Sequence, residues 1–329
     1  MIPAATSSGP GSVAVDMRTS LGAALIPSPV LTASGCAAAG RELDPFLDLT
    51  ALGAVVTKSV QLRARSGRAT PRMAETPSGM LNSIGLQGPG IDAFLATDLP
   101  WLAARGARAM VSIAGSSVEE YAQLASRLRG AGGMIALEVN ISCPNVESRG
   151  EVFACDPAAS SAVLAAVRSA DPGVPVYAKL SPDVTDIVTV AHACVDAGAD
   201  GISAINTLLG LVIDTDTMRP VLAAGTGGLS GPAVRPVALR CVWQIHRALP
   251  DTPILGMGGI TTGTDALQFI LAGASAVSVG TAVFGDPRAP ERICHELARA
   301  LAGKGFARLT DAVGYAHQAA GTPPGQVST

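Results

Sequence analysis

The sequence predicts an α/β protein built on a closed (β/α)8 barrel, or TIM barrel, with a long insertion after the second strand. Three observations favour this fold. Short apolar runs bounded by Gly, Pro, Asn or Ser recur along the chain, and helix-period segments separate most of them. The 329 residues also suit a single barrel of about 250 residues with insertions. A doubly wound open sheet is the alternative.

Eight short apolar segments are expected to be strands, because strands covered on both faces of a parallel sheet are apolar along their whole length. Eight such strands alternating with helices form a sheet that closes on itself. In chain order the segments are 30–34, 54–59, 109–115, 135–140, 175–180, 201–206, 253–259 and 276–280.

Helices are expected between most of these strands, where apolar residues recur at helical spacing. Several of the segments begin with Ser, Asp or Thr and end with Gly, as helix caps do. The expected helices are 117–130, 156–170, 183–198, 233–249 and 262–273.

Two connections are too long for ordinary turns, 61–90 after the second strand and 208–232 after the sixth. Both are rich in turn residues, and long connections at the carboxyl ends of barrel strands usually build a site or a lid. We expect one domain over 13–318, between disordered tails over 1–12 and 319–329.

Charge and composition favour small-molecule partners. Charged residues make up 15% of the chain, the formal net charge is −3, and Lys and Arg are scattered, so neither nucleic acid nor a membrane surface is an expected partner. The sequence contains no apolar run of about 18 residues and no secretory signal, so we expect a cytoplasmic protein.

The six cysteines are far apart, with no Cys-x-x-Cys pair and no His at ligand spacing, so no metal site is expected on this chain. Disulfides are not expected in a cytoplasmic protein either. Cys143 stands between two asparagines where a strand should give way to a loop, and its thiol could be a nucleophile, a metal ligand, a proton carrier or a small buried group. We interpret the other five as small core residues: Cys36, Cys155, Cys194, Cys241 and Cys294.

Polar and cationic residues stand at the predicted carboxyl ends of the strands, where barrels assemble their active sites. The glycines among them close strands seven and eight, the two positions where barrels commonly hold a phosphate on backbone N–H groups. We therefore expect a phosphate-bearing ligand, and tight turns alone are the other explanation. The set is nearly without carboxylates: Ser34, Lys58, Ser59, Ser112, Asn140, Lys179, Asn206, Thr207, Gly258, Gly259, Gly280 and Thr281.

Two lysines and four asparagines indicate the chemistry of the ligand. Lys58 and Lys179, at the ends of interior strands, must each meet an anion or lose a proton, and a Schiff-base lyase could use either. Asparagine amides both donate and accept hydrogen bonds, which suits a pyrimidine acid, although each could also serve a turn. The four are Asn82, Asn140, Asn145 and Asn206.

Seven stretches, found in order between residues 14 and 286, resemble the catalytic FMN-binding subunit of class 1B dihydroorotate dehydrogenases. They are TPRMAETPSGMLNSIGLQGPG, EVNISCPNV, AKLSPDVTDIV, AINTLLG, GGLSGPA, GMGGI and AGASAVSVGTA. The resemblance implies an FMN-containing barrel that oxidises (S)-dihydroorotate to orotate in pyrimidine biosynthesis. It also implies a homodimer at the core of a heterotetramer, whose partner subunits hold FAD and a [2Fe–2S] cluster and reduce NAD⁺.

The same resemblance implies roles for individual residues. Cys143, in an active-site loop after the fourth strand, would be the base that takes a proton from C5 of the substrate, and Lys179 would lie at the N1–C2=O edge of the flavin. The implied substrate-binding residues are Lys58, Asn82, Ser83, Ile84, Gly85, Leu86, Asn140, Asn145, Asn206 and Thr207. The implied FMN-binding residues are Ser34, Lys58, Ser59, Ser112, Asn140, Lys179, Ile205, Gly231, Gly258, Gly259, Gly280 and Thr281.

Two features depart from the family pattern. Ser112 stands where an asparagine is expected to touch FMN, and 146–157 replaces a more glycine-rich loop. The alternatives are a class 1A enzyme that uses fumarate and a flavin subunit like that of dihydropyrimidine dehydrogenase, which shares the run within AKLSPDVTDIV. From other classes they are a phosphate-binding Schiff-base lyase and a flavin-binding module without catalysis.

Overall fold

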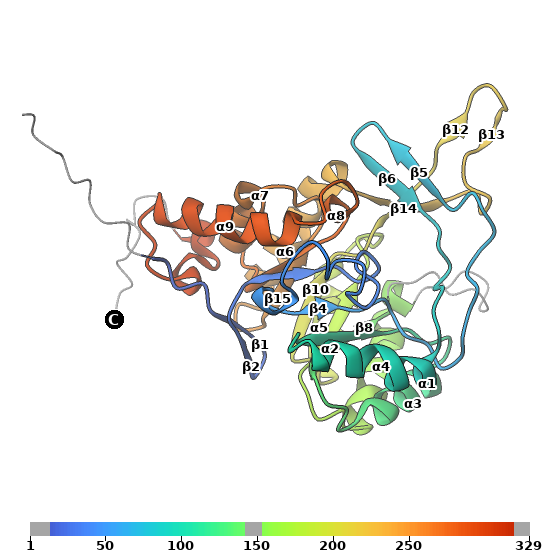
Figure 1. Cartoon of the computed structure of the whole chain (residues 1–329), viewed down its shortest axis with the longest axis horizontal. Helices are drawn as coiled ribbons and strands as arrows, with labels where there is room; N and C mark the ends of the chain where they lie inside the picture. The colour runs from blue at the N-terminus through green and yellow to red at the C-terminus, as the bar shows by residue number, and fades with distance from the viewer. Residues whose placement is uncertain (1–13, 142–152, 319–329) are drawn as a thin grey trace, which may run out of the picture.

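Eight parallel strands form the central sheet of the computed structural model, which describes residues 14–141 and 153–318 (Figure 1). Their spatial order is β3-β16-β15-β10-β9-β8-β7-β4, and each overlaps a predicted strand. The predicted (β/α)8 barrel is therefore confirmed. The strands are β3 (Val30–Thr32), β4 (Val55–Val56), β7 (Ala109–Ile113), β8 (Met134–Asn140), β9 (Val176–Leu180), β10 (Gly201–Ala204), β15 (Ile254–Met257) and β16 (Ala276–Val279).

The barrel closes where β3 meets β4. The backbone N–H of Gly53 donates to the Val30 carbonyl at 2.8 Å. Further along the same seam, the Val56 N–H donates to the Thr32 side-chain Oγ1 at 3.0 Å, and Thr32 is fully buried. A threonine hydroxyl thus replaces a backbone carbonyl at the seam, and it satisfies a buried N–H that would otherwise have no partner.

The predicted helices are confirmed, and they cover the outside of the barrel (Figure 1). Side chains cap them as expected: Ser117 accepts from the Glu120 N–H, and Thr262 with Asp265 forms a capping box. The connection from β3 to β4 carries only a short 3-10 turn, η1 (Leu49–Ala51). The helical elements are α1 (Ile91–Ala93), η2 (Phe94–Asp98), α2 (Leu99–Ala104), α3 (Val118–Leu128), η3 (Phe153–Cys155), α4 (Pro157–Ser169), α5 (Ile187–Asp196), η4 (Pro232–Val234), α6 (Arg235–Ala248), α7 (Gly263–Leu271), α8 (Ala282–Gly285), α9 (Ala289–Ala302), η5 (Leu309–Ala312) and η6 (Tyr315–His317).

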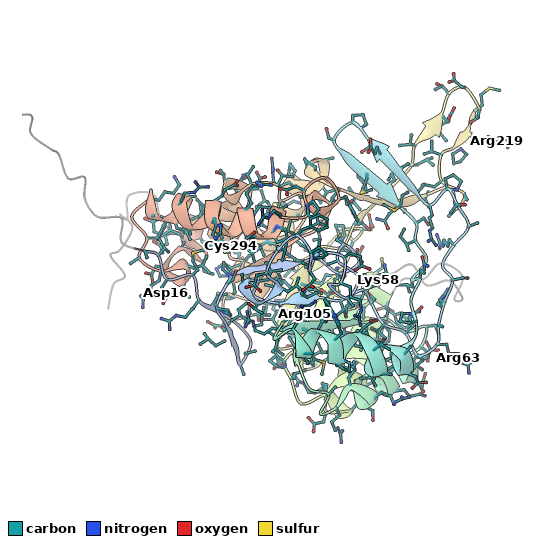
Figure 2. The ribbon with its side chains drawn as sticks, in the orientation of Figure 1. Asp16, Lys58, Arg63, Arg105, Arg219 and Cys294 are labelled. Carbon is teal, nitrogen blue, oxygen red and sulfur yellow. The ribbon has the colours of Figure 1, made fainter. Side chains whose placement is uncertain are left out.

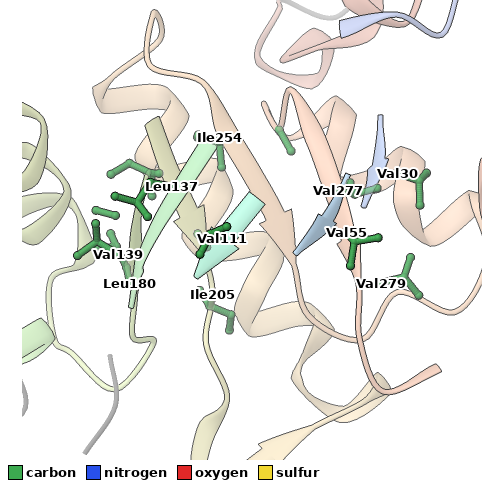
Figure 3. Packing of buried hydrophobic residues seen from close by; sticks show 14 of the residues in the cluster. Val30, Val55, Val111, Leu137, Val139, Leu180, Ile205, Ile254, Val277 and Val279 are labelled. Atoms are coloured by element: carbon green, nitrogen blue, oxygen red, sulfur yellow. The ribbon is translucent and has the colours of Figure 1, made fainter. Parts of the chain in front are cut away.

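Alternate side chains along the strands serve two apolar clusters. Val111, Leu137 and Val139 belong to the cluster between barrel and helices, part of which is drawn in Figure 3. Their neighbours Met110 and Ala136 belong to a second cluster, which fills the barrel interior near the amino ends of the strands.

A hairpin of β1 (Thr19–Leu21) and β2 (Ala24–Ile26) joins this interior cluster. Its residues Leu21 and Ile26 are buried there, and the Thr19 hydroxyl donates to the Ser275 carbonyl just before β16. The hairpin therefore plugs the amino end of the barrel and leaves the carboxyl end for chemistry.

The two long connections come together in a four-stranded antiparallel sheet of order β11-β14-β6-β5. Together with the hairpin of β12 and β13 it forms a lobe that stands away from the barrel (Figure 1). The sequence indicated long insertions here but not their strands. The strands are β5 (Met73–Thr76), β6 (Gly79–Asn82), β11 (Leu208–Gly210), β12 (Ile213–Asp214), β13 (Arg219–Pro220) and β14 (Gly227–Ser230).

The predicted tails over 1–12 and 319–329 lie outside the described residues, and the single domain over 13–318 stays a prediction. Within 14–141 and 153–318, no helix has the length and apolar character needed to cross a membrane.

Replacing Thr32 with Val should destabilise the barrel, because the change keeps the shape of the side chain and leaves the Val56 N–H buried without an acceptor. We expect the free energy of unfolding, measured by denaturant titration, to fall by about 1–3 kcal/mol. The control is Thr264→Val on the exposed face of α7, which should change it by less than about 0.5 kcal/mol. Equal stabilities of the two variants would contradict this account of the seam.

Candidate functional site

Four predicted polar residues meet at the carboxyl end of the barrel. The Asn140 amide donates to Ser59 Oγ at 3.0 Å, and Ser59 Oγ lies 2.9 Å from Ser112 Oγ. The Asn206 amide lies 3.4 Å from Asn140 Oδ1. These residues come from the ends of β4, β7, β8 and β10, so one network, in which only Asn206 is half-buried and the others are buried, links positions that are far apart in sequence.

The two predicted lysines lie on the same end. Lys179 donates to Ser34 Oγ at 2.8 Å and lies 3.6 Å from a carboxylate oxygen of Glu138. Lys58, labelled in Figure 2, follows β4, and a Cβ added to Gly35 would be 3.2 Å from its Nζ.

Cys36 lies beside these two lysines. Burial raises the pKa of its thiol to about 11, and the positive charges of Lys179 and Lys58 oppose that rise. A Cβ added to Gly280 would lie 3.5 Å from the Cys36 sulfur, so this cysteine belongs to the site and not only to the core.

Sequence reasoning missed Glu138, because it considered only the last residues of each strand. Glu138 is two residues before Asn140 on β8 and so points to the same side of the sheet. A charged residue inside an otherwise apolar strand was the available signal.

The antiparallel sheet brings the two halves of the predicted substrate site together. Gly228 pairs with Asn82, whose side-chain amide donates to the Gly228 carbonyl at 3.3 Å. Thr207 is so close that a Cβ on Gly228 would lie 2.0 Å from its hydroxyl. Asn82 and Thr207 thus flank one glycine of β14, although Asn82 comes from the first insertion and Thr207 from the end of the sixth barrel strand.

The predicted substrate-binding stretch from Ser83 to Leu86 lies against Arg68, which sequence reasoning also missed. The Arg68 guanidinium donates to Ser83 Oγ at 2.8 Å, and the Arg68 N–H donates to the Ile84 carbonyl at 2.9 Å. Gly85 has a positive φ of 78°, and a Cβ there would lie 2.6 Å from Arg68 Cγ. Arg68 therefore fixes this stretch from the side of the first insertion.

The predicted glycines form a backbone cradle. Gly259 has φ +69°, and a Cβ there would lie 2.6 Å from the Gly231 carbonyl oxygen. The Thr281 hydroxyl donates to Ser230 Oγ at 2.8 Å, which joins the end of β16 to the same loop. Ile205 is buried nearby, and a Cβ on Gly258 would lie 3.7 Å from its Cγ1.

Cys143 and Asn145 lie outside the described residues, so their roles stay predictions. The described chain stops at Ile141 and resumes at Phe153, and the Ala154 N–H donates to the Ile141 carbonyl at 3.0 Å. The interpretation of Cys155 as a core residue is wrong. Its side chain is exposed, because in the short turn η3 it is Ala154, and not Cys155, that faces the core.

Comparison with known proteins decides the family. The family model described as Dihydroorotate dehydrogenase matches residues 17–301. The chain belongs to the dihydroorotate dehydrogenase family. This confirms the resemblance found in the sequence.

Several relatives carry the name "Dihydroorotate dehydrogenase B (NAD(+)), catalytic subunit". One from Pelobacter propionicus is 53% identical over 299 residues, which are 91% of this chain and 98% of the relative. One from Desulforudis audaxviator is 51% identical over 294 residues, 89% of this chain and 95% of the relative. One from Geobacter sulfurreducens is 50% identical over 299 residues, 91% and 97% of the two chains.

The residues of this dihydroorotate dehydrogenase fit FMN. Gly231, Gly259 and Gly280 present backbone without side chains at the positions predicted for a phosphate, where an added Cβ would meet neighbouring atoms of the chain. The hydroxyls of Ser59 and Ser112 and the amide of Asn140 supply neutral donors for a flavin ring, and Lys179 supplies a cation. Among residues 14–141 and 153–318, no group of three or more His, Cys, Asp or Glu could hold a metal ion.

Replacing Gly259 with Ala should weaken FMN binding, because the new methyl group meets the Gly231 carbonyl and the residue must keep a positive φ. A loss of about tenfold in affinity or more follows from a penalty of only 1–2 kcal/mol. Flavin fluorescence titration of the apoprotein measures it. Gly285→Ala is the control, because a Cβ there has no neighbour within 4 Å, and unchanged FMN affinity in Gly259→Ala would refute the cradle.

Proposed function

We propose that this chain is the catalytic subunit of an NAD⁺-linked, class 1B dihydroorotate dehydrogenase, which oxidises (S)-dihydroorotate to orotate in pyrimidine biosynthesis. The observation that carries the proposal is that Asn82 and Thr207 flank Gly228, while Asn140 lies within hydrogen-bond distance of Asn206, the residue before Thr207, at the barrel end where the glycines suit an FMN phosphate. The names of the relatives, at about half identity over most of both chains, support the same reaction.

The donors and acceptors at this site match dihydroorotate, which carries one carboxylate and a ring of alternating N–H and C=O groups. The Lys58 ammonium would complement the carboxylate. The amides of Asn82, Asn140, Asn145 and Asn206 and the Thr207 hydroxyl would pair with the ring, since each can donate and accept. The backbone of Ser83 to Leu86, held by Arg68, would close one side.

The oxidation removes a proton from C5 and a hydride from C6 of the substrate. Bound FMN would supply the two-electron acceptor for the hydride. The chain must supply the base, and Cys143 would take the C5 proton as a thiolate and become a thiol. Asn140, two hydrogen bonds from Ser112, would hold the substrate ring between that base and the flavin.

Anaerobic addition of dihydroorotate to the purified protein tests the reaction. The yellow protein should lose its visible flavin absorbance. A colourless protein that takes up no FMN would favour the Schiff-base lyase, and a yellow protein that does not bleach would favour a non-catalytic flavin module. Steady turnover with fumarate would place the chain in class 1A.

The Cys143→Ala variant should reduce its flavin about 10² to 10⁴-fold more slowly with dihydroorotate, which is the usual effect of losing a general base. Stopped-flow absorbance measures the rate, and the oxidised flavin spectrum should stay unchanged. Cys155→Ala is the matched control, because it removes an exposed thiol at the other end of the same connection. Flavin reduction at the parental rate in Cys143→Ala would show that Cys143 is not the base.

The electrons would leave through a partner subunit that holds FAD and a [2Fe–2S] cluster. Gly227 and Gly228 of GTGGLSG lie inside strand β14, which pairs antiparallel with β11 and β6, so this stretch is not the glycine turn of a parallel dinucleotide-binding βαβ unit. A cytoplasmic location, expected from the sequence, stays a prediction.

A homodimer would use the antiparallel lobe. Large apolar side chains are exposed on it, among them Leu209 at 61% and Met218 at 82%. Leu211 and Ile213 are also exposed in the same insertion, and several exposed large apolar side chains in one segment favour a protein contact there.

The double variant Leu209→Asp, Met218→Asp should therefore be monomeric at concentrations where the parent protein is a dimer, because each charge would be buried without a partner in the interface. Sedimentation velocity measures the oligomeric state. Leu25→Asp is the control: Leu25 is 70% exposed on β2, at the plugged end of the barrel. A parent protein that is monomeric, or a double variant that stays dimeric, would exclude the lobe as the dimer contact.

A further inference from the structure

Glu138 is a buried carboxylate whose place in the barrel calls for an explanation. It is fully buried in β8, and its neighbour Ala136 on the same side of the strand belongs to the interior cluster. Within the described residues neither carboxylate oxygen has a hydrogen-bond partner. Its one ion pair with another described residue is with Lys179, whose Nζ lies 3.6 Å from Oε1.

Such an arrangement is costly for stability. A carboxylate in a protein interior loses its hydration, and a single ion pair without further hydrogen bonds does not fully offset that loss. The surrounding positions Met110, Ala136 and Tyr177 show that this barrel can fill its interior with apolar or aromatic side chains. The carboxylate therefore points to a role beyond packing.

The geometry at Lys179 indicates what that role is. The Lys179 side chain is 5% exposed and is held from two sides, by Ser34 Oγ at 2.8 Å and by Glu138 at 3.6 Å. Ser34 follows β3 and Glu138 lies in β8, so the two contacts fix the ammonium across the barrel end. Glu138 is the negative charge that accompanies this cation, and both side chains are buried.

We infer that Glu138 is a positioning residue that holds Lys179 in place and offsets its positive charge at the flavin site, and so lowers the reduction potential of bound FMN. The inference depends on the proposed FMN binding next to Lys179. Charge near the flavin N1 position changes the relative stability of the oxidised and reduced cofactor, because reduction places negative charge there. An uncompensated lysine would favour the reduced form, and the carboxylate restrains that effect.

The test is the midpoint potential of bound FMN, measured by equilibration with a redox dye and without substrate. Glu138→Gln keeps the shape and removes the charge, so it should favour binding of reduced over oxidised FMN by about tenfold, equivalent to a rise of about 30 mV for a two-electron couple. Glu138→Asp keeps the charge and should stay near the parental potential. Glu119→Gln, an exposed charge removal on α3, is the matched control and should not change it.

A double-mutant cycle shows whether Glu138 acts through Lys179. Lys179→Met should lower the potential, and adding Glu138→Gln to it should have less effect than in the parent. If Glu138→Gln alone does not fold, the double variant, in which both charges are absent, keeps the comparison with Lys179→Met available. An unchanged potential in Glu138→Gln, or equal effects of that change in both backgrounds, would overturn the inference.

The two proposals fail in different ways. A protein that takes up no FMN would refute the proposed cofactor. A protein that binds FMN and bleaches with dihydroorotate, but whose potential does not respond to Glu138→Gln, would refute only the role of Glu138.

Discussion

Closure of the barrel between β3 and β4 is the constraint on which the site depends. Ser34 follows β3 and Lys179 lies in β9, several strands away in the sheet, yet their side chains are in hydrogen-bond contact. An open sheet with the same strand order would keep them apart. The closing contacts are few, and the Thr32 hydroxyl supplies one that the backbone alone does not make.

The second constraint is the antiparallel sheet that ties the two insertions to each other. The barrel supplies the cradle and the network around Ser59 and Asn140, whereas the insertions supply Asn82 and the stretch from Ser83 to Leu86. Residues proposed for the cofactor thus stand mainly on rigid strand ends. Much of the proposed substrate contact stands on a separate sheet, so the two kinds of binding rest on different parts of the fold.

The barrel strands and their helices could be predicted from sequence because their signals are local: an apolar run, a cap, a glycine. The strands of the lobe could not. β6 and β14 are rich in glycine, which has low strand propensity, and Asn82 pairs with Gly228, a partner 146 positions away. Their pairing is a property of the folded chain, and a single sequence carries no local trace of it.

The candidate site was predicted at strand ends, and there the structure brings several of the predicted residues together, while Cys143 and Asn145 lie outside the described residues. The site also contains residues that do not lie at strand ends. Glu138 lies below the strand end, and Arg68 lies in a connection whose path depends on the lobe. The prediction for Cys155 was wrong because burial was inferred from residue type alone. The sequence does not show whether that side chain faces the core or the solvent.

The hairpin that plugs the amino end of the barrel has an electrostatic consequence at the opposite end. Leu21 and Ile26 are buried in the interior cluster at the amino end of the barrel. The buried Glu138 and Lys179 therefore lie next to an apolar interior of low permittivity. The strength of that pair, and any influence it has on a cofactor, therefore depends on two aliphatic side chains near the start of the chain that touch neither substrate nor flavin. The hairpin thus keeps the barrel interior beside the Glu138–Lys179 pair apolar.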